Sequence, residues 1–339
     1  MAAVDNLIKC LFVIIFLSTR SVPGVDAQLT PAFYDSTCPF VESIVRSGVE
    51  EAIRRDARMA ASLLRLHFHD CMVHGCDGSI LLDDMPGFVG EKNAFANVNS
   101  VRGYEVIDDI KSELESICPG MVSCSDILTI AARDSVEQSG GPSWDVSLGR
   151  RDSLTADKNA ANQLIPGPGF SVAQLISNFE AVGLFASDVA TLSGAHTIGA
   201  AKCSTFRQRF FNQSANGKPD PTIDPDYLRS VQQLCKRLRD PNILGSLDPF
   251  TPMQFDNIYY KNVQSGIALL GSDQALFSTH GITRMQVETY SFDQEAFFMD
   301  FATSMQRLGE LSPLTEGEGE IRQNCRYVNS FNRRHRHCH

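Results

Sequence analysis

This sequence of 339 residues lacks the motifs of the common nucleotide-dependent enzymes. It has no Walker A loop and no G-x-G-x-x-G fingerprint, so neither ATP nor NAD chemistry has support. Basic residues are also scarce: 30 Lys and Arg stand against 40 Asp and Glu, which gives a net charge of −10. Because an acidic protein repels phosphate backbones, we expect no nucleic-acid partner.

Long apolar runs are absent beyond the first 27 residues. Before that point, Lys9 precedes an apolar run over 10–17, and small residues suit a cleavage after Ala27. This pattern predicts a secretory signal peptide over residues 1–27. A membrane anchor is the alternative, but spanning a bilayer needs roughly 20 apolar residues. We therefore expect a secreted protein without a membrane partner, whose new N-terminus Gln28 can cyclise to pyroglutamate.

If the protein is secreted, its ten cysteines fall into three groups: one in the signal peptide, one in the tail and eight in the domain. Cys10 leaves with the signal peptide, and Cys338 lies in the C-terminal tail. An even remainder in an oxidising compartment predicts four disulfides, although spacing alone selects no pairing. The remaining cysteines are Cys38, Cys71, Cys76, Cys118, Cys124, Cys203, Cys235 and Cys325.

Apolar residues make up 43% of the chain, and their spacing is mostly that of helices. There is no internal repeat, and only short strands are plausible, so the predicted fold class is mainly α. The clearest helical segments are 41–53, 59–66, 106–117, 125–136, 172–182, 186–192 and 297–308.

We expect one domain over residues 28–329, followed by a basic, His-rich tail over 330–339. A solvated, disordered tail is the simplest interpretation. Weak metal binding, a sorting signal and contact with a cell-wall polyanion are the alternatives. Asn212 begins an Asn-Gln-Ser sequon, so it could carry a glycan.

The segment 65–71 contains the most informative pair of side chains. Arg65 and His69 are four residues apart, so on a helix they share a face, while His67 points elsewhere. A neutral imidazole can move a proton between the oxygens of a peroxide, and a guanidinium can stabilise the charge that develops as the O–O bond breaks. A solvated helix face is the alternative explanation of this spacing.

Two oxygen-rich segments have the ligand types that Ca²⁺ prefers. The first follows His69 and the second lies near 248–256. Cys71, His74 and Cys76 alternatively suit zinc, as in a secreted hydrolase, although these thiols are expected to form a disulfide. A calcium-stabilised binding module without catalysis is a further alternative. The oxygen donors are Asp70, Val73, Gly75, Asp77 and Ser79 in the first segment, and Asp248, Thr251 and Asp256 in the second.

His196 follows an apolar segment that we expect to be helical, so it should face inward. An inward histidine is often a hydrogen-bonded core residue, but a neutral imidazole is also the usual axial ligand of haem in peroxidases and globins. No Cys-x-x-Cys-His motif occurs, so any haem would be held without covalent bonds.

Together these segments resemble the secretory plant peroxidases of class III. The resemblance covers about residues 28–329. It rests on motifs in the order 28–34 (QLTPAFY), 65–70 (RLHFHD), 75–79 (GCDGS), 141–144 (GPSW), 149–152 (GRRD), 193–197 (SGAHT), 255–260 (FDNIYY), 272–274 (SDQ) and 321–325 (IRQNC).

The resemblance implies a two-lobed helical fold with one haem b between the lobes. His196 would be the axial ligand, and Asp273 would accept its other N–H. His69 would be the distal acid–base group, Arg65 would polarise the peroxide and Phe68 would wall the pocket. Further implied roles are those of Asn97, which accepts the distal histidine N–H, and Pro166, which lines the exposed haem edge.

The resemblance also implies two Ca²⁺ ions and a disulfide pairing. The first ion would be held by Asp70, Val73, Gly75, Asp77 and Ser79, with Glu91 acting through water. The second would be held by Thr197, Asp248, Thr251, Gln254 and Asp256. The implied disulfides are Cys38–Cys118, Cys71–Cys76, Cys124–Cys325 and Cys203–Cys235.

The expected activity is that of a secreted peroxidase. It would reduce H₂O₂ to water through an oxidised haem intermediate, which then oxidises phenols or other small aromatic donors in two one-electron steps. We expect a monomer in the extracellular space or cell wall, with the vacuole as the alternative destination. The sequence does not identify the physiological donor.

Overall fold

The computed structural model describes residues 29–213, 217–237 and 242–330. The predicted signal peptide, Gln28 and residues 331–339 of the tail lie outside this part of the chain. No single helix within it is long and apolar enough to cross a membrane, although 172–182 and 186–197 pass that test together as a bent pair.

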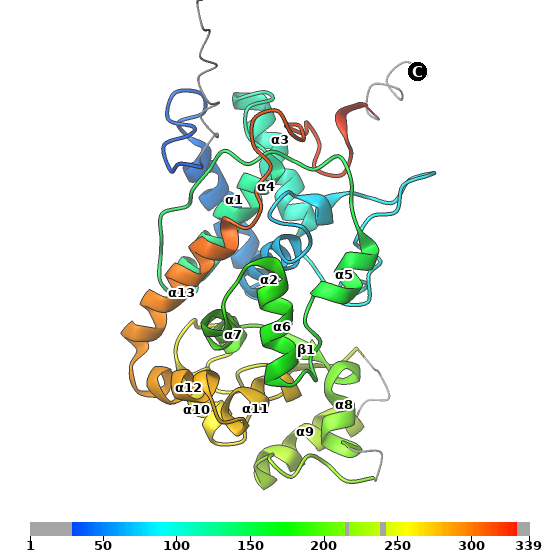
Figure 1. Ribbon diagram of the computed structural model, residues 1–339, viewed down its shortest axis with the longest axis vertical. Coiled ribbons are helices and arrows are strands. Elements are labelled where there is room, and N and C mark those ends of the chain that lie inside the picture. The colour runs from blue at the N-terminus through cyan, green and yellow to red at the C-terminus, as the bar shows by residue number, and fades with distance from the viewer. Residues whose placement is uncertain (1–28, 214–216, 238–241, 331–339) are drawn as a thin grey trace, which may run out of the picture.

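The first group of helices surrounds α4 (Cys124–Gln138), as Figure 1 shows. Helices α1 (Val41–Arg55), α2 (Met59–Cys71) and α3 (Tyr104–Ile117) all pack against it. The side chains of α4 are buried from Cys124 to Val136 because neighbours cover it on all sides, and Ser123 caps its first turn by accepting the Asp126 N–H (3.1 Å).

The second group is built on α12 (Ile282–Phe292), which packs against α7, α10, α11 and α13. Helix α13 also contacts α2, and so it connects the two groups. The bounds are α7 (Ala186–Ser193), α10 (Ile258–Gln264), α11 (Gly271–Ser278) and α13 (Gln294–Gly309).

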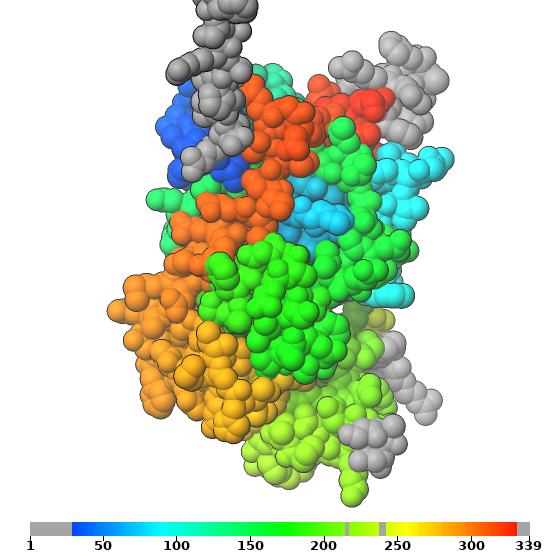
Figure 2. All heavy atoms as spheres, viewed as in Figure 1, coloured from blue at the N-terminus to red at the C-terminus, as the bar shows by residue number. Residues whose placement is uncertain are grey.

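The remaining elements are short. A single antiparallel pair of strands is described, β1 (Ala200–Lys202) with β2 (Leu244–Ser246), in which Ala200 lies opposite Ser246. A smaller core around the Cys203–Cys235 disulfide joins the two helices that project at the lower end of Figure 2. These are α8 (Cys203–Phe211) and α9 (Pro225–Arg237), and the other elements are η1 (Ser79–Leu81), α5 (Lys158–Leu164), α6 (Val172–Val182) and η2 (Gly194–Thr197).

The predicted fold class, mainly α with minor short strands, is confirmed. Each helix predicted from periodicity is present, and most extend further than predicted, as α2 does from 59–66 to Met59–Cys71. The sequence prediction did not include α5 or α8 to α12. Helices α5, α8, α10 and α11 are too short for a clear periodic pattern, whereas the helical spacing of the apolar residues in α9 was missed.

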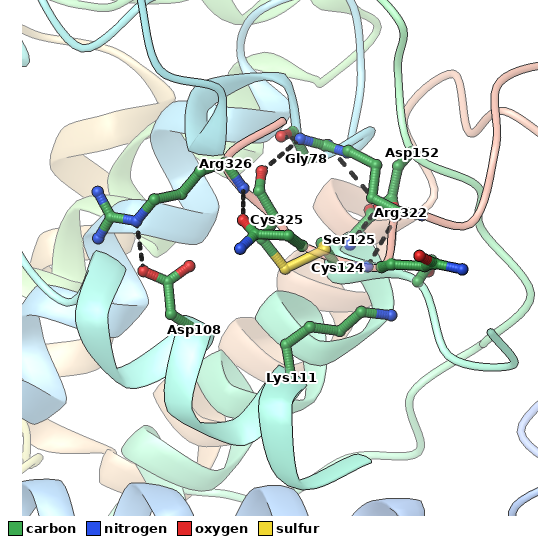
Figure 3. The surroundings of a disulfide bond; sticks show 12 residues. Gly78, Asp108, Lys111, Cys124, Ser125, Asp152, Arg322, Cys325 and Arg326 are labelled. Atoms are coloured by element: carbon green, nitrogen blue, oxygen red, sulfur yellow. Dashed lines mark hydrogen bonds and ion pairs between the residues drawn. A yellow bond between two sulfur atoms is a disulfide. The ribbon is translucent and has the colours of Figure 1, made fainter. Parts of the chain in front are cut away.

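The described part of the chain contains four disulfides, with the pairing that the resemblance implies: Cys38–Cys118, Cys71–Cys76, Cys124–Cys325 and Cys203–Cys235. The Cys124–Cys325 bond ties the C-terminal segment to the start of α4 (Figure 3). Beside it, the fully buried Arg322 donates to the carbonyls of Cys325 (2.7 Å) and Gly78 (2.6 Å). This network anchors the end of the domain to the loop that follows α2.

Candidate active site

Helix α2 presents different side chains on its two faces. Arg65 and His69, one turn apart, lie on the same face, and Phe68 beside them contacts the ring of Phe179 on α6 (ring centroids 6.1 Å apart). His67 lies on another face, where its Nδ1 is 3.5 Å from the Sγ of Cys71 and burial lowers its pKa to about 3. The helical spacing therefore separates the two histidines as the sequence predicts.

The loop over residues 91–100 positions both Arg65 and His69. Asn97 donates through Nδ2 to the Glu91 carbonyl (2.9 Å), and its Oδ1 is 2.6 Å from Nδ1 of His69. Because Oδ1 can only accept, His69 carries its proton on Nδ1, which leaves the Nε2 lone pair open. Arg65 donates to the Ser100 hydroxyl and to the Ala96 carbonyl, both at 2.9 Å.

The surroundings of His69 favour the neutral imidazole. Its side chain is buried, and this burial together with the charge of Arg65 lowers its pKa well below the usual 6.5, although the hydrogen bond to Asn97 acts in the opposite direction. Burial also lowers the pKa of Arg65 to about 10, so its guanidinium stays charged near neutral pH. The pair thus combines a neutral base with a fixed cation.

The second histidine, His196, lies in η2 directly after α7. Its Nδ1 is 2.8 Å from Oδ1 of Asp273 in the first turn of α11, and Tyr259 donates to the same oxygen (3.0 Å). Partial removal of the ring from water lowers the pKa of His196, but the Asp273 carboxylate outweighs this effect and the net change is upward. A carboxylate partner of this kind fixes the orientation of an imidazole and makes it a stronger ligand.

The residues present fit a haem between these two histidines. The charge of Arg65 lowers the pKa of both His69 and His196, so both rings lie within reach of the same guanidinium. Although His196 has its Nδ1 bound, 35% of its side chain is exposed, and no described residue makes a hydrogen bond to its Nε2. An oriented imidazole with an open Nε2 is the donor that an axial haem site needs.

The first oxygen cluster lies at the C-terminal end of α2. Asp70, Asp77, Ser79 and Glu91 are all buried there, and neither the Ser79 hydroxyl nor Glu91 Oε2 has a hydrogen-bond partner among the described residues. Burial raises the pKa of the three carboxyl groups, that of Glu91 to about 8. Converging carboxylates with unsatisfied oxygens suit a bound divalent cation.

The Cys71–Cys76 disulfide and Gly75 shape the loop that carries this cluster. Gly75 has φ 113°, and a Cβ atom at this position would lie 2.5 Å from the Ser312 carbonyl oxygen. Glycine is therefore required by both backbone conformation and close approach. Val73 and Gly75 occupy the tight turn between Asp70 and Asp77, where main-chain oxygens are available.

The second oxygen cluster joins three segments. Oδ1 of Asp256 accepts from the hydroxyls of Thr197 (3.3 Å) and Thr251 (3.2 Å), and Thr251 also lies 3.3 Å from Oδ2 of Asp248. The Gln254 N–H donates to the Thr251 carbonyl (3.0 Å), which places Gln254 in the same turn. Since Thr197 follows His196 directly, this cluster is attached to the second histidine as the first is attached to His69.

The zinc site that the sequence left open is not formed by its expected residues. His74 is largely exposed and its Nε2 lies 3.1 Å from Asp157, and it does not belong to the metal-ligand group that contains Cys71 and Cys76. In the described part of the chain, the compact group of metal-ligand types is instead His67, Cys71 and Cys76. Its two sulfur atoms are joined in a disulfide and so cannot act as thiolate ligands.

Two other predicted positions lie outside the paired histidines. Pro166 is half-buried in the segment that connects α5 to α6, and Asn212 is exposed directly after α8. Sequence reasoning did not assign the contacts of Ser100 and Ala96 with Arg65, or the bond from Tyr259 to Asp273. No local pattern marks the first two, whereas Tyr259 belongs to a motif noted above.

Comparison with known proteins shows which chemistry this site serves. The model of the Peroxidase family matches residues 45–293, which include both histidines and both oxygen clusters. The protein is therefore a peroxidase, an enzyme that carries out H₂O₂-dependent oxidation.

The similar proteins are plant enzymes. Peroxidase 15 of Arabidopsis thaliana is 50% identical over 307 residues, which is 91% of each chain. Peroxidase 49 of Arabidopsis thaliana is 49% identical over 94% of this chain and 96% of its own. Peroxidase 15 of Ipomoea batatas is 48% identical over 97% of this chain and all of its own. The chain belongs to the plant class III peroxidases, a secretory family of haem enzymes, and its four disulfides accord with an oxidising compartment.

Proposed function

We propose that this enzyme oxidises phenols or similar small aromatic donors outside the cell, that His196 would hold its haem, and that His69 and Arg65 would act on the peroxide. The observation that carries this proposal is that the two imidazoles have the same hydrogen-bonding arrangement. Each has Nδ1 tied to a buried acceptor, Asn97 or Asp273, and each has an open Nε2 near Arg65.

His69 and Arg65 divide the work on the peroxide side. Nε2 of His69 takes the proton from one peroxide oxygen and delivers it to the other, which leaves as water. Asn97 maintains the tautomer that keeps Nε2 free for this transfer. Arg65 stabilises the negative charge that develops on the separating oxygens, and Phe68 limits the space beside them.

His196 would hold the haem through Nε2, while Asp273 orients the ring through its Nδ1. When bound, haem would supply the one-electron redox chemistry that links H₂O₂ to the aromatic donor. Pro166 lines the edge where a small aromatic donor meets the haem. A shallow site of this kind selects donors by access more than by specific contacts.

Two Ca²⁺ ions complete the enzyme in this proposal. One is held by the side chains of Asp70, Asp77 and Ser79 and by main-chain oxygens of Val73 and Gly75, with Glu91 in its outer shell. The unsatisfied Ser79 and Glu91 oxygens support this site. The second is held by Thr197, Asp248, Thr251, Gln254 and Asp256.

The maturation of the chain is part of the same proposal. Cleavage after Ala27 would leave Gln28 as the N-terminus, and Asn212, whose side chain is exposed, would accept a glycan. The mature enzyme would act as a monomer.

A visible spectrum tests the proposal. The purified protein should show a haem Soret band that shifts when one equivalent of H₂O₂ is added and returns when a simple phenol follows. His196→Ala should lose haem or bind it weakly. A protein without a Soret band, or a mutant with unchanged haem content and iron coordination, would contradict these assignments.

A further inference from the structure

Three tyrosines form a continuous row from the His196 site towards the surface of the second helix group. The ring of Tyr259 lies 6.2 Å from that of His196, Tyr260 lies 5.0 Å from Tyr259, and Tyr290 lies 5.1 Å from Tyr260, all measured between ring centroids. All three rings are buried, with Tyr290 on α12 at the outer end of the row. Adjacent aromatic rings at such distances provide closely coupled sites for electron transfer.

The three phenols differ in where a proton could go. Tyr260 donates only to the main-chain carbonyls of Ala190 (3.0 Å) and Thr191 (3.3 Å), which are poor proton acceptors. Tyr259 donates to Asp273, but this carboxylate is already the partner of His196.

Tyr290 is different because its partner reaches solvent. Its hydroxyl donates to Oδ2 of Asp300 (2.7 Å), and Asp300 is exposed on α13, which runs along the surface in Figure 2. Burial raises the pKa of all three phenols, so each keeps its proton until an electron is removed. Only at Tyr290 can the proton then pass to a carboxylate in contact with water.

We propose that Tyr290 is a second redox-active site of this peroxidase, connected to the haem site through Tyr260 and Tyr259. After the haem site has reacted with H₂O₂, one electron moves from Tyr290 along the row to it, and the phenol proton moves to Asp300. A neutral tyrosyl radical remains, and the haem site retains one oxidising equivalent fewer.

The return step gives this site a function. A phenolic donor at the surface of α12 and α13 supplies one electron to the radical, its own proton goes to solvent, and Asp300 returns the proton to Tyr290. Such a donor does not have to enter the haem pocket, so phenols attached to a polymer become substrates. This inference rests on the proposed peroxidase function.

Freeze-quench electron paramagnetic resonance of the holoenzyme tests the inference. With H₂O₂ and no donor, the wild type should give a tyrosyl radical, and Tyr290→Phe should lose it. Asp300→Asn, an exposed substitution that leaves every ring in place, should reduce the radical yield. Tyr327→Phe, a tyrosine outside the row, should retain the wild-type signal.

A donor comparison completes the test. The rate with a phenol attached to high-molecular-weight dextran, divided by the rate with the free phenol, should fall in Tyr290→Phe and stay unchanged in Tyr327→Phe. An undiminished radical in both Tyr290→Phe and Asp300→Asn would overturn this inference and leave the proposed peroxidase function standing. A haem-loaded wild type that does not react with H₂O₂ would overturn the proposed function as well.

Discussion

Replacing Asp273 by Asn tests how strongly the second histidine depends on its carboxylate. Asn has nearly the same size and can still accept the His196 N–H, so the substitution removes the charge and keeps the shape. The carboxylate is buried, lies 2.8 Å from Nδ1 of His196 and raises its pKa. Asp273→Asn should therefore make Nε2 a weaker ligand.

Two independent magnitudes agree on the size of this effect. A hydrogen bond to a charged group contributes about 1.5–3 kcal/mol. Loss of a partner of this kind typically weakens metal binding by about 10–100-fold, which corresponds to about 1.4–2.7 kcal/mol. We therefore expect haem affinity to fall by about 10–100-fold.

The assay is titration of the haem-free protein with haem, followed at the Soret band, together with the rate of haem loss to an excess of apomyoglobin. Asp109→Asn is a matched control because Asp109 is exposed on α3, far along the chain from this site. Circular dichroism shows whether both variants keep their helices. Unchanged haem affinity in Asp273→Asn, or an equal loss in Asp109→Asn, would refute the reasoning.

Three further predictions concern calcium, pH and packing. Removing a Ca²⁺ present at about 100 times its Kd should lower the free energy of unfolding by about 2.7 kcal/mol, or the Tm by about 4 °C for a domain of about 300 residues. It should also slow the peroxide reaction, because Asp70 adjoins His69. A chelated protein with unchanged Tm and rate would contradict the cation sites. Burial and Arg65 lower the pKa of His69, so its base form persists in mild acid. The rate of the peroxide reaction should therefore be constant from about pH 8 to about pH 6.5 and fall only below that. A midpoint of this fall in rate near or above about pH 6.5 would argue against the neutral base. Gly194→Ala should lower the free energy of unfolding in urea by about 1–3 kcal/mol, because a Cβ atom there collides with Tyr260 and Phe297. An unchanged free energy of unfolding would show that Tyr260 and Phe297 can shift to make room.

The sequence pattern predicted the amphipathic and fully apolar helices because their buried apolar residues recur at helical spacing within the segment itself. Helix α1 is an example, since Val41, Ile44, Val45 and Val49 are all buried. Helix α10 has only seven residues, so its sequence has no pattern that distinguishes it from a loop, and its stability depends on tertiary packing. Helix α9 (PDYLRSVQQLCKR) is different, because its apolar residues do recur at helical spacing, and the sequence prediction missed that signal.

The site divides in the same way. The shared face of Arg65 and His69 follows from helical spacing, because four residues make about one turn. The partners of the histidines are 28 residues away for Asn97 and 77 residues away for Asp273, so only the family resemblance identified them. Two features could be identified only from the three-dimensional structure: the hydrogen bonds that position Arg65, and the row of tyrosines.

Stopped-flow measurement of the reaction between haem-loaded enzyme and H₂O₂ tests the central claim most directly. His69→Ala should slow this reaction by about 10²–10⁴-fold, because it removes the base that moves the peroxide proton. Arg65→Ala should slow it by no more than His69→Ala does. His67→Gln, two residues away on another face of α2, should react at nearly the wild-type rate. A slow His67→Gln variant beside a His69→Ala variant of normal rate would contradict the account.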